Sequence, residues 1–275
     1  MGLQQERLGM TFLKRETMSD SNVHRKESAP PNGSGPKSEQ LSNLWHIWFP
    51  GILFLSWVLI FEFTNLDLCC SDIFYDFNKA RFYWRNTWWA NQLLHKGGLY
   101  AIASVVIVSL ILLIRSFLTR NNRWVNWQRA LIFLILSVAI GSGTAGLLKA
   151  VTNRHYPTHI ERYGGDAPYR KLFQSVPPGF KRTKGFPAAH ASGGYSLMAS
   201  YFIFYKRNKV RAYLGLALGL TVGTLFAFGQ QVRGVHFASH NIWSAAICWY
   251  ACLFLYLYPF RRKVNGPLFK SAVQV

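Results

Sequence analysis

Long apolar runs alternate with shorter polar connections along most of this 275-residue chain. Each run is about twenty residues long, the length that an α-helix needs to cross roughly 30 Å of hydrocarbon. We predict six membrane-spanning helices, at residues 44–64, 98–117, 129–151, 188–205, 212–230 and 241–260. The pattern therefore predicts an all-α fold, a bundle of six transmembrane helices.

Two longer polar stretches separate these spans. Residues 71–95 mix aromatic rings with Lys79, Arg81 and Arg85, which predicts an interfacial helix in the headgroup region, or alternatively a lid over a lipid entrance. Residues 151–186 form a long outer loop. At the ends, residues 1–42 are a polar tail with too little apolar surface to fold, and residues 263–275 are a second tail, which leaves 43–262 as the membrane domain.

Glycine is frequent inside the predicted spans. Gly215, Gly219 and Gly223 recur at every fourth residue, so they lie on one face of a helix. Small residues at this spacing let membrane helices approach closely. We predict that this glycine face is a helix–helix contact.

The chain carries a net charge of +20, which by itself could indicate a nucleic-acid partner. Its Lys and Arg residues lie mostly between the apolar runs, where anionic lipid headgroups account for them, so we expect a lipid bilayer as partner and no nucleic acid. Basic flanks at 115–129 and 206–211 predict the cytoplasmic side. The four cysteines have the spacing of neither a disulfide framework nor a zinc site.

Three short stretches on the opposite, outer side concentrate candidate chemistry: Lys149–Pro157, Phe186–Ser192 and Arg233–Asn241. Each lies where an apolar run meets a polar connection. Taken singly, a snorkelling lysine or a surface histidine would explain each of these residues. Taken together, cations and imidazoles on one membrane face suit phosphoryl transfer without a metal.

The residue types suggest specific roles. Lys149, Arg233 and Arg154 would hold the phosphate oxygens, because fixed positive charge stabilises the transferring group. His240 would attack phosphorus, with His236 as the alternative, and His190 would protonate the leaving oxygen. We expect neither a metal nor another cofactor, since the outer half lacks a carboxylate cluster.

These stretches resemble the signature of the type-2 phosphatidic acid phosphatase superfamily: Lys, six residues, Arg-Pro; then Pro-Ser-Gly-His; then Ser-Arg, five residues, His, three residues, Asp. Lys149 and Pro157 keep their spacing, but Tyr156 replaces the arginine and Arg154 substitutes from nearby. Pro187 and His190 are kept without the serine and glycine between them. In the third block Val232 replaces the serine, six residues separate Arg233 from His240, and Ser244 takes the place of the aspartate.

The missing aspartate matters because a carboxylate would fix the tautomer of the nucleophilic imidazole and stabilise its cation. Asn241, Ser239 or Ser244 could orient the ring, and Asp166 or Glu161 could supply the charge. Without such a group we expect activity to be weakened or lost, and a non-catalytic relative is the alternative.

The stretches look like a divergent bacterial branch of this superfamily, similar to lipid A phosphatases, and the resemblance implies a metal-independent lipid phosphatase that works through a phosphohistidine. It implies a multi-pass protein of the bacterial inner membrane whose site faces the periplasm. Lipid A, undecaprenyl diphosphate and phosphatidylglycerol phosphate are all candidate substrates. One alternative is a lipid phosphotransferase with the same site, and another is a transporter or structural membrane protein. The sequence leaves the oligomeric state open.

Overall fold

The computed structural model describes residues 36–119 and 122–260, with side chains at 44–119 and 127–258. The chain divides into two units, Met1–Asn43 and Leu44–Val275. The predicted polar tail is helical in part, because helix α2 begins at Pro36 and ends at Phe63. Residues 1–35 of that tail, and the predicted tail at 263–275, lie outside the described residues.

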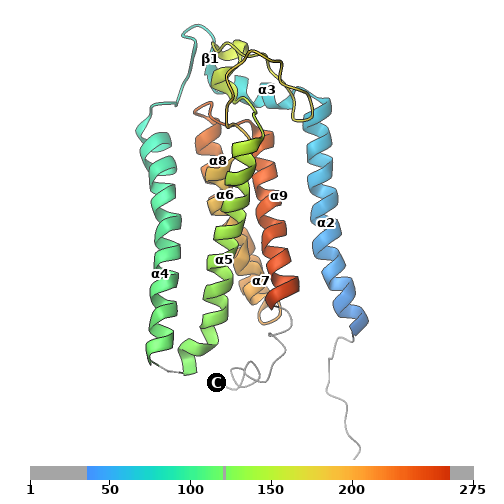
Figure 1. Cartoon of the computed structure of the whole chain (residues 1–275), viewed down its shortest axis with the longest axis vertical. Helices are drawn as coiled ribbons and strands as arrows, with labels where there is room; N and C mark the ends of the chain where they lie inside the picture. The colour runs from blue at the N-terminus through green and yellow to red at the C-terminus, as the bar shows by residue number, and fades with distance from the viewer. Residues whose placement is uncertain (1–35, 120–121, 261–275) are drawn as a thin grey trace, which may run out of the picture. The chain divides into compact units, whose positions relative to one another are not determined.

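The described residues are mostly helical (Figure 1). After α2 the elements are α3 (Leu66–Asp72), β1 (Tyr75–Asp76), β2 (Arg81–Phe82), the π-helical η1 (Trp89–Gly97), α4 (Gly98–Thr119), α5 (Asn122–Val151), the short turns η2 (Pro157–His159) and η3 (Glu161–Tyr163), α6 (Ala189–Tyr195), η4 (Ser196–Met198), α7 (Ala199–Phe204), α8 (Lys209–Gln231), α9 (Ala238–Leu255) and η5 (Tyr256–Phe260).

Five helical segments in the described ranges are long and apolar enough to cross a membrane: Leu44–Phe63, Trp89–Thr119, Trp127–Val151, Lys209–Gln231 and Ala238–Tyr258. The helical bundle is therefore confirmed, but a sixth such span is not. The predicted span at 188–205 consists of α6, η4 and α7 in succession. Residues 191–199 of this segment are buried among the other helices, so small and polar residues are tolerated there.

The glycine face of α8 packs directly against α6, η4 and α7. A Cβ atom on Gly223 would lie 2.2 Å from the Tyr195 ring, and one on Gly219 would lie 2.4 Å from the backbone nitrogen of Met198. The prediction of a close helix–helix contact is confirmed, because these positions leave no space for a side chain.

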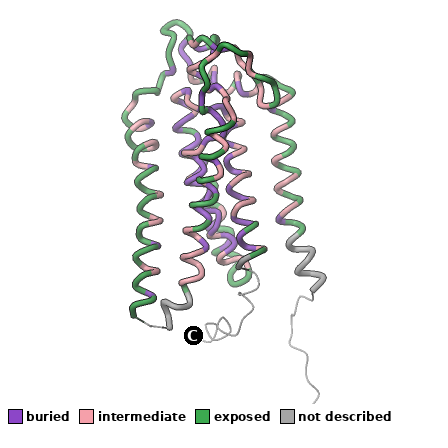
Figure 2. The backbone as a smooth tube through the Cα atoms, viewed as in Figure 1, coloured by how far each residue is buried: buried purple, intermediate pink, exposed green. Residues whose placement is uncertain are grey.

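Burial differs sharply between the helices (Figure 2). Buried residues concentrate along α6 and α9, whereas α2 and α4 are largely exposed. Large apolar side chains lie on these exposed helices, for example Trp48 on α2, 63% exposed, and Leu118 on α4, 79% exposed. Exposed apolar surface of this extent is typical of contact with lipid.

The aromatic segment at 71–95 is not the single interfacial helix that the sequence predicted. It contains an antiparallel hairpin in which Tyr75 pairs with Phe82, followed by η1, which continues into α4. The Asp76 carboxylate accepts hydrogen bonds from the backbone N–H groups of Asn78 (3.1 Å) and Lys79 (3.2 Å), which favours a turn over a helix.

Tyr75 and Phe82 belong to a small buried cluster with Ile160, Tyr163 and Phe237. These rings therefore form a core between the hairpin and the connection that links α5 to α6, instead of a belt facing lipid. Figure 1 shows this connection at the same end of the helices as α3 and β1. The long outer loop that the sequence predicted is present, and it covers the last turn of α5 and the first turn of α9.

Candidate functional site

Lys149 lies in the last turn of α5 and is half-buried. In the described part of the chain its ammonium has no ion-pair partner, since Arg162 with Asp72 is the ion pair found there. The charge of Lys149 acts electrostatically on four imidazoles, those of His95, His190, His236 and His240. This ammonium is therefore the point around which the candidate site is arranged.

Arg233 lies in the turn between α8 and α9. Its Nη1 donates to the Gln230 side-chain oxygen (3.2 Å) and its Nε donates to the Arg85 backbone oxygen (3.4 Å). The next residue, Gly234, has a φ of 71°, a conformation that favours glycine, and a Cβ there would lie 2.3 Å from the Phe82 ring. The turn is thus fixed against the hairpin, and it holds the guanidinium in place.

His236 and His240 lie on either side of the start of α9 and are both buried, with ring centroids 5.9 Å apart. The backbone of Gly185 acts as a hydrogen-bond partner of both rings, while the Nδ1 atoms of both rings lack one. Burial lowers the pKa of His236 well below its ordinary value, so its imidazole is neutral at pH 7. A neutral imidazole has the free electron pair that a nucleophile needs.

His190 lies in the first turn of α6. Its Nε2 is 3.2 Å from the backbone oxygen of Leu94, and its ring centroid is 4.9 Å from that of His95. A carbonyl that accepts from one ring nitrogen fixes the tautomer, which leaves the other nitrogen for proton transfer. The electrostatic neighbours of His190 include Arg233 and Lys149.

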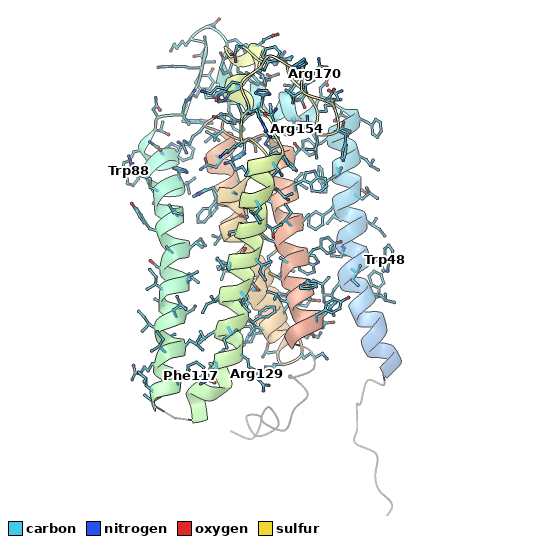
Figure 3. All side chains as sticks on the ribbon, viewed as in Figure 1. Trp48, Trp88, Phe117, Arg129, Arg154 and Arg170 are labelled. Atoms are coloured by element: carbon cyan, nitrogen blue, oxygen red, sulfur yellow. The ribbon has the colours of Figure 1, made fainter. Side chains whose placement is uncertain are left out.

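Arg154 follows α5, and its side chain hydrogen-bonds the connection between α5 and α6 (Figure 3). Its Nη1 donates to the backbone oxygens of Lys171 (3.3 Å) and Gln174. Burial lowers its pKa, and its charge acts on His240. The Arg154 backbone oxygen also accepts from Gly185 N–H (2.7 Å), where a Cβ would lie 2.3 Å from that same oxygen. Arg154 thus holds the connection in place next to His240.

The structure brings all five predicted site residues to one end of the helices. The sequence did not predict which cation acts on which imidazole. Arg233 acts on His95 and His190, whereas Arg154 acts on His240. Lys149 acts on all four imidazoles, and His236 is influenced by both His190 and His240. His236 is therefore within electrostatic reach of both other histidines.

His95 was missed by sequence reasoning. It is separated from His190 by 95 positions in the chain and belongs to a segment that was interpreted as an interfacial helix. A signal was nevertheless present, because it is a histidine directly before an apolar span on the outer side.

The groups expected to replace the aspartate do not contact the His240 ring. The Ser244 hydroxyl donates to the backbone oxygens of Ala188 (3.1 Å) and His240 (3.0 Å), and the Asn241 side-chain oxygen is buried without a partner. Asp166 and Glu161 are both exposed on the outer connection, and neither is among the electrostatic neighbours of His236 or His240.

A different carboxylate reaches the start of α9. Asp67, on α3, accepts hydrogen bonds from the backbone N–H (2.9 Å) and the hydroxyl of Ser239. Burial raises the pKa of Asp67 to about 6. Ser239 directly precedes His240, so this carboxylate holds the backbone of α9 where it carries the imidazole.

A cleft adjoins Asp67 on the side of α9 that faces α2. Its apolar and aromatic lining residues are Trp57, Val58, Phe61, Tyr169, Leu172, Ile242 and Trp243, and its polar and charged ones are Glu62, Asp67, Lys171 and Ser239. None of the predicted site residues lines it. Among the described residues, no three His, Cys, Asp or Glu side chains are grouped as a metal site would require.

Residues 130–263 match the family model of the PAP2 superfamily. Members of this superfamily are phosphatases, so the match indicates a phosphoric ester hydrolase of the type-2 phosphatidic acid phosphatase kind, and the apolar helices indicate a membrane protein. The PAP2 match includes Lys149, His190 and His240, but it begins after Asp67 and His95. No curated protein and no solved structure matches the chain.

The third block of the PAP2 signature fits this chain in a second way. With His236 as its histidine, Gln230 takes the place of the arginine, five residues follow, and three residues after His236 comes His240 in the place of the aspartate. This placement keeps both spacings without an insertion. It is consistent with the structure, because Arg233 lies one helical turn beyond Gln230 and contacts its side chain.

Proposed function

We propose that this protein is an integral membrane phosphatase that hydrolyses the phosphomonoester or diphosphate of a membrane lipid through a phosphohistidine. The observation that carries this proposal is the position of Lys149. Its half-buried ammonium, without an ion-pair partner among the described residues, acts on both His190 and His236. A cation within electrostatic reach of two imidazoles suits metal-free phosphoryl transfer.

The reaction that this arrangement supports has two steps. Lys149 and Arg233 hold the phosphate oxygens while an imidazole nitrogen of His236 attacks phosphorus. The bond from phosphorus to the lipid oxygen breaks, and His190 gives a proton to that oxygen. Burial lowers the pKa of His190 to about 4, so the negative charge of the bound phosphate has to raise that pKa before His190 carries this proton. Water then attacks the phosphohistidine, the phosphorus–nitrogen bond breaks, and His190 takes a proton from the water.

We assign the attack to His236, in place of His240, which the sequence favoured. His236 is influenced by His190 and Lys149, whereas the neighbours of His240 are Lys149 and Arg154. His240 is then a positioning residue, 5.9 Å away between ring centroids, where the family carries an aspartate. An imidazole cannot supply the negative charge of that aspartate, but it can orient a neighbouring ring.

Phosphate release from lipids tests the proposal directly. Purified full-length protein in lipid nanodiscs would be incubated with lipid A, undecaprenyl diphosphate, phosphatidylglycerol phosphate and phosphatidic acid. We expect release of inorganic phosphate that vanadate inhibits and EDTA does not. Absence of release from every lipid by folded protein would reject a phosphatase. Transfer to a lipid hydroxyl in place of water would appear as a new labelled lipid.

Trapping the intermediate separates the two nucleophile assignments. With 32P-labelled substrate and rapid quenching at alkaline pH, His236→Ala should give no phosphoenzyme, while His240→Ala should retain a reduced amount. The reverse pattern would assign the attack to His240. His159→Ala is the matched control, because His159 lies on the outer connection, and Lys149 is not among its electrostatic neighbours.

The substrate and the location are further parts of this proposal. Arg154 lies at the end of the helices away from Arg129 (Figure 3), just beyond the last turn of α5, which carries Lys149. Arg129 belongs to the basic flank that is predicted to be cytoplasmic, so the site would face the periplasm of a bacterial inner membrane. A glycolipid of the lipid A type is the substrate that we favour.

A further inference from the structure

His95 brings another imidazole into the proposed site from outside the three signature stretches. It lies in η1, the π-helical segment Trp89–Gly97 that leads into α4. Short π-helical segments are frequent at functional sites, because the wider turn shifts side chains from their regular positions. Its ring is tilted by 46° to that of His190, with the centroids 4.9 Å apart.

The Nδ1 atom of His95 is enclosed and has no hydrogen-bond partner. A buried polar atom left unpaired costs about 1–3 kcal/mol, so such an atom calls for an explanation. The charges that act on the ring are all positive, those of Arg233, Lys96 and Lys149. A half-buried imidazole within electrostatic reach of three cations is suited to donate a hydrogen bond to an anion.

Neither arginine of the family signature is kept in its place. Tyr156 replaces the first, and Gln230 replaces the second in the placement that we favour. The two guanidinium groups nearby already donate to other groups, Arg154 to backbone oxygens of the connection and Arg233 to the Gln230 side chain and the Arg85 backbone oxygen. A further donor beside His190 would add to the hold on a phosphate that presents three oxygens.

We infer that His95 is a substrate-contacting residue whose Nδ1–H donates a hydrogen bond to a phosphate oxygen next to His190. This inference rests on the proposed function, and it adds a binding residue from a segment outside the family match. Its backbone neighbour Leu94 contacts the His190 ring at the same time. One turn of η1 would therefore both orient the proton donor and bind the group on which it acts.

A purely structural role for His95 predicts a different outcome, which three variants can separate. His95→Phe keeps a ring in place but removes both nitrogens, and His95→Asn places a donor near the position of Nδ1. His95→Ala removes both ring and donor. Gln92→Ala is the matched control, because its exposed side chain belongs to the same segment.

Steady-state kinetics with the best lipid substrate gives the first readout. We expect His95→Phe to lower kcat/KM and to weaken vanadate inhibition by about tenfold or more, the effect of losing one hydrogen bond to a charged group. His95→Asn should recover a substantial part of kcat/KM and of vanadate inhibition. The thermal midpoints of His95→Phe and His95→Asn should equal that of the wild type. Wild-type values of kcat/KM and vanadate affinity in His95→Phe would overturn the inference. The proposed phosphatase function would not be affected by that result.

Chemical protection gives a second readout that needs no turnover. The wild-type protein would be modified with diethyl pyrocarbonate, with and without inorganic phosphate, and the modified histidines would be quantified by mass spectrometry. We expect phosphate to protect His95 but not His159. Equal modification of His95 in both samples would contradict the inference even if every lipid tested were inert. Protection of His95 in a protein without phosphatase activity would instead reject the proposed function alone.

Discussion

The Asp67 carboxylate accepts hydrogen bonds from both the backbone N–H and the hydroxyl of Ser239. The two residues are 172 positions apart in the chain. Ser239 lies in the first turn of α9, where backbone N–H groups have no partner within the helix. This contact therefore fixes the start of the helix that carries His240, directly after the turn that carries His236.

Removing this carboxylate should reduce both stability and activity. Asp67→Ala leaves the Ser239 N–H without its acceptor, and loss of such a helix cap costs about 1 kcal/mol. Because α9 would shift next to both imidazoles, we expect kcat to fall more than KM rises. The measurements are the thermal midpoint and steady-state kinetics in nanodiscs.

Asp72→Ala is the matched control, since Asp72 lies on the same helix α3 but accepts hydrogen bonds from Arg162 and Tyr163, on the connection between α5 and α6, and not from α9. Equal loss of activity in both variants would show that α3 as a whole, and not the Asp67 contact, supports the site.

The stability contributed by Asp67 should depend on pH. Burial raises its pKa from 3.8 to about 6 in the folded protein, so the folded state binds this proton more tightly than the unfolded state. The contribution of Asp67 to stability should therefore fall as pH rises from about 4 to about 6, and then stay constant. The difference in thermal midpoint between wild type and Asp67→Asn, measured from pH 4 to 8, isolates this effect. A constant difference over that range would contradict it.

The glycine face of α8 should tolerate no methyl group. Gly223→Ala places a Cβ 2.2 Å from the rigid Tyr195 ring, so α8 and α6 must separate. We expect a loss of about 1–3 kcal/mol, seen as a lower thermal midpoint in detergent. Gly143→Ala on α5 is the control, because nothing lies within 4 Å of its Cβ position. Similar midpoints for the two variants would refute the close contact.

Lys149 should be required for phosphate binding in the proposed reaction. Lys149→Met keeps an unbranched side chain of nearly the same length but removes the charge, and loss of one such stabilising group typically lowers the rate by about 10²–10³-fold. Vanadate inhibition should weaken with it. Lys184→Met is the control, since Lys184 is exposed but close enough to act on Lys149 electrostatically. Comparable losses in both variants would indicate a general effect of positive charge at this surface.

Arg154 should act through the connection that it holds. Arg154→Lys keeps the charge but cannot reproduce the planar donor group that reaches the Lys171 and Gln174 carbonyls. We expect faster limited proteolysis at residues 170–185, with vanadate inhibition changed by less than about threefold. Weaker vanadate inhibition with unchanged proteolysis would instead show direct phosphate contact, the role that the sequence predicted.

The sequence located the apolar helices well, because hydrophobic length is a local property of the chain. The predicted spans at 98–117, 212–230 and 241–260 each lie largely within α4, α8 and α9. The segment at 188–205 is helical as predicted, but it consists of three short helical pieces in succession and is not among the segments long and apolar enough to span a membrane. The hairpin at 75–82 was missed because a run of aromatic residues is compatible both with a lipid-facing belt and with a small buried core, and the sequence alone does not distinguish the two.

By itself, the sequence determined that the chain forms apolar helices, that Gly215, Gly219 and Gly223 make a close contact, and that cations and imidazoles lie at one end. These features follow from residue type and periodicity. Only the tertiary structure decided that His95 lies beside His190 and that Asp67 binds Ser239. Such contacts join residues that are far apart in the chain, and they depend on how the helices and connections pack, which no local pattern encodes.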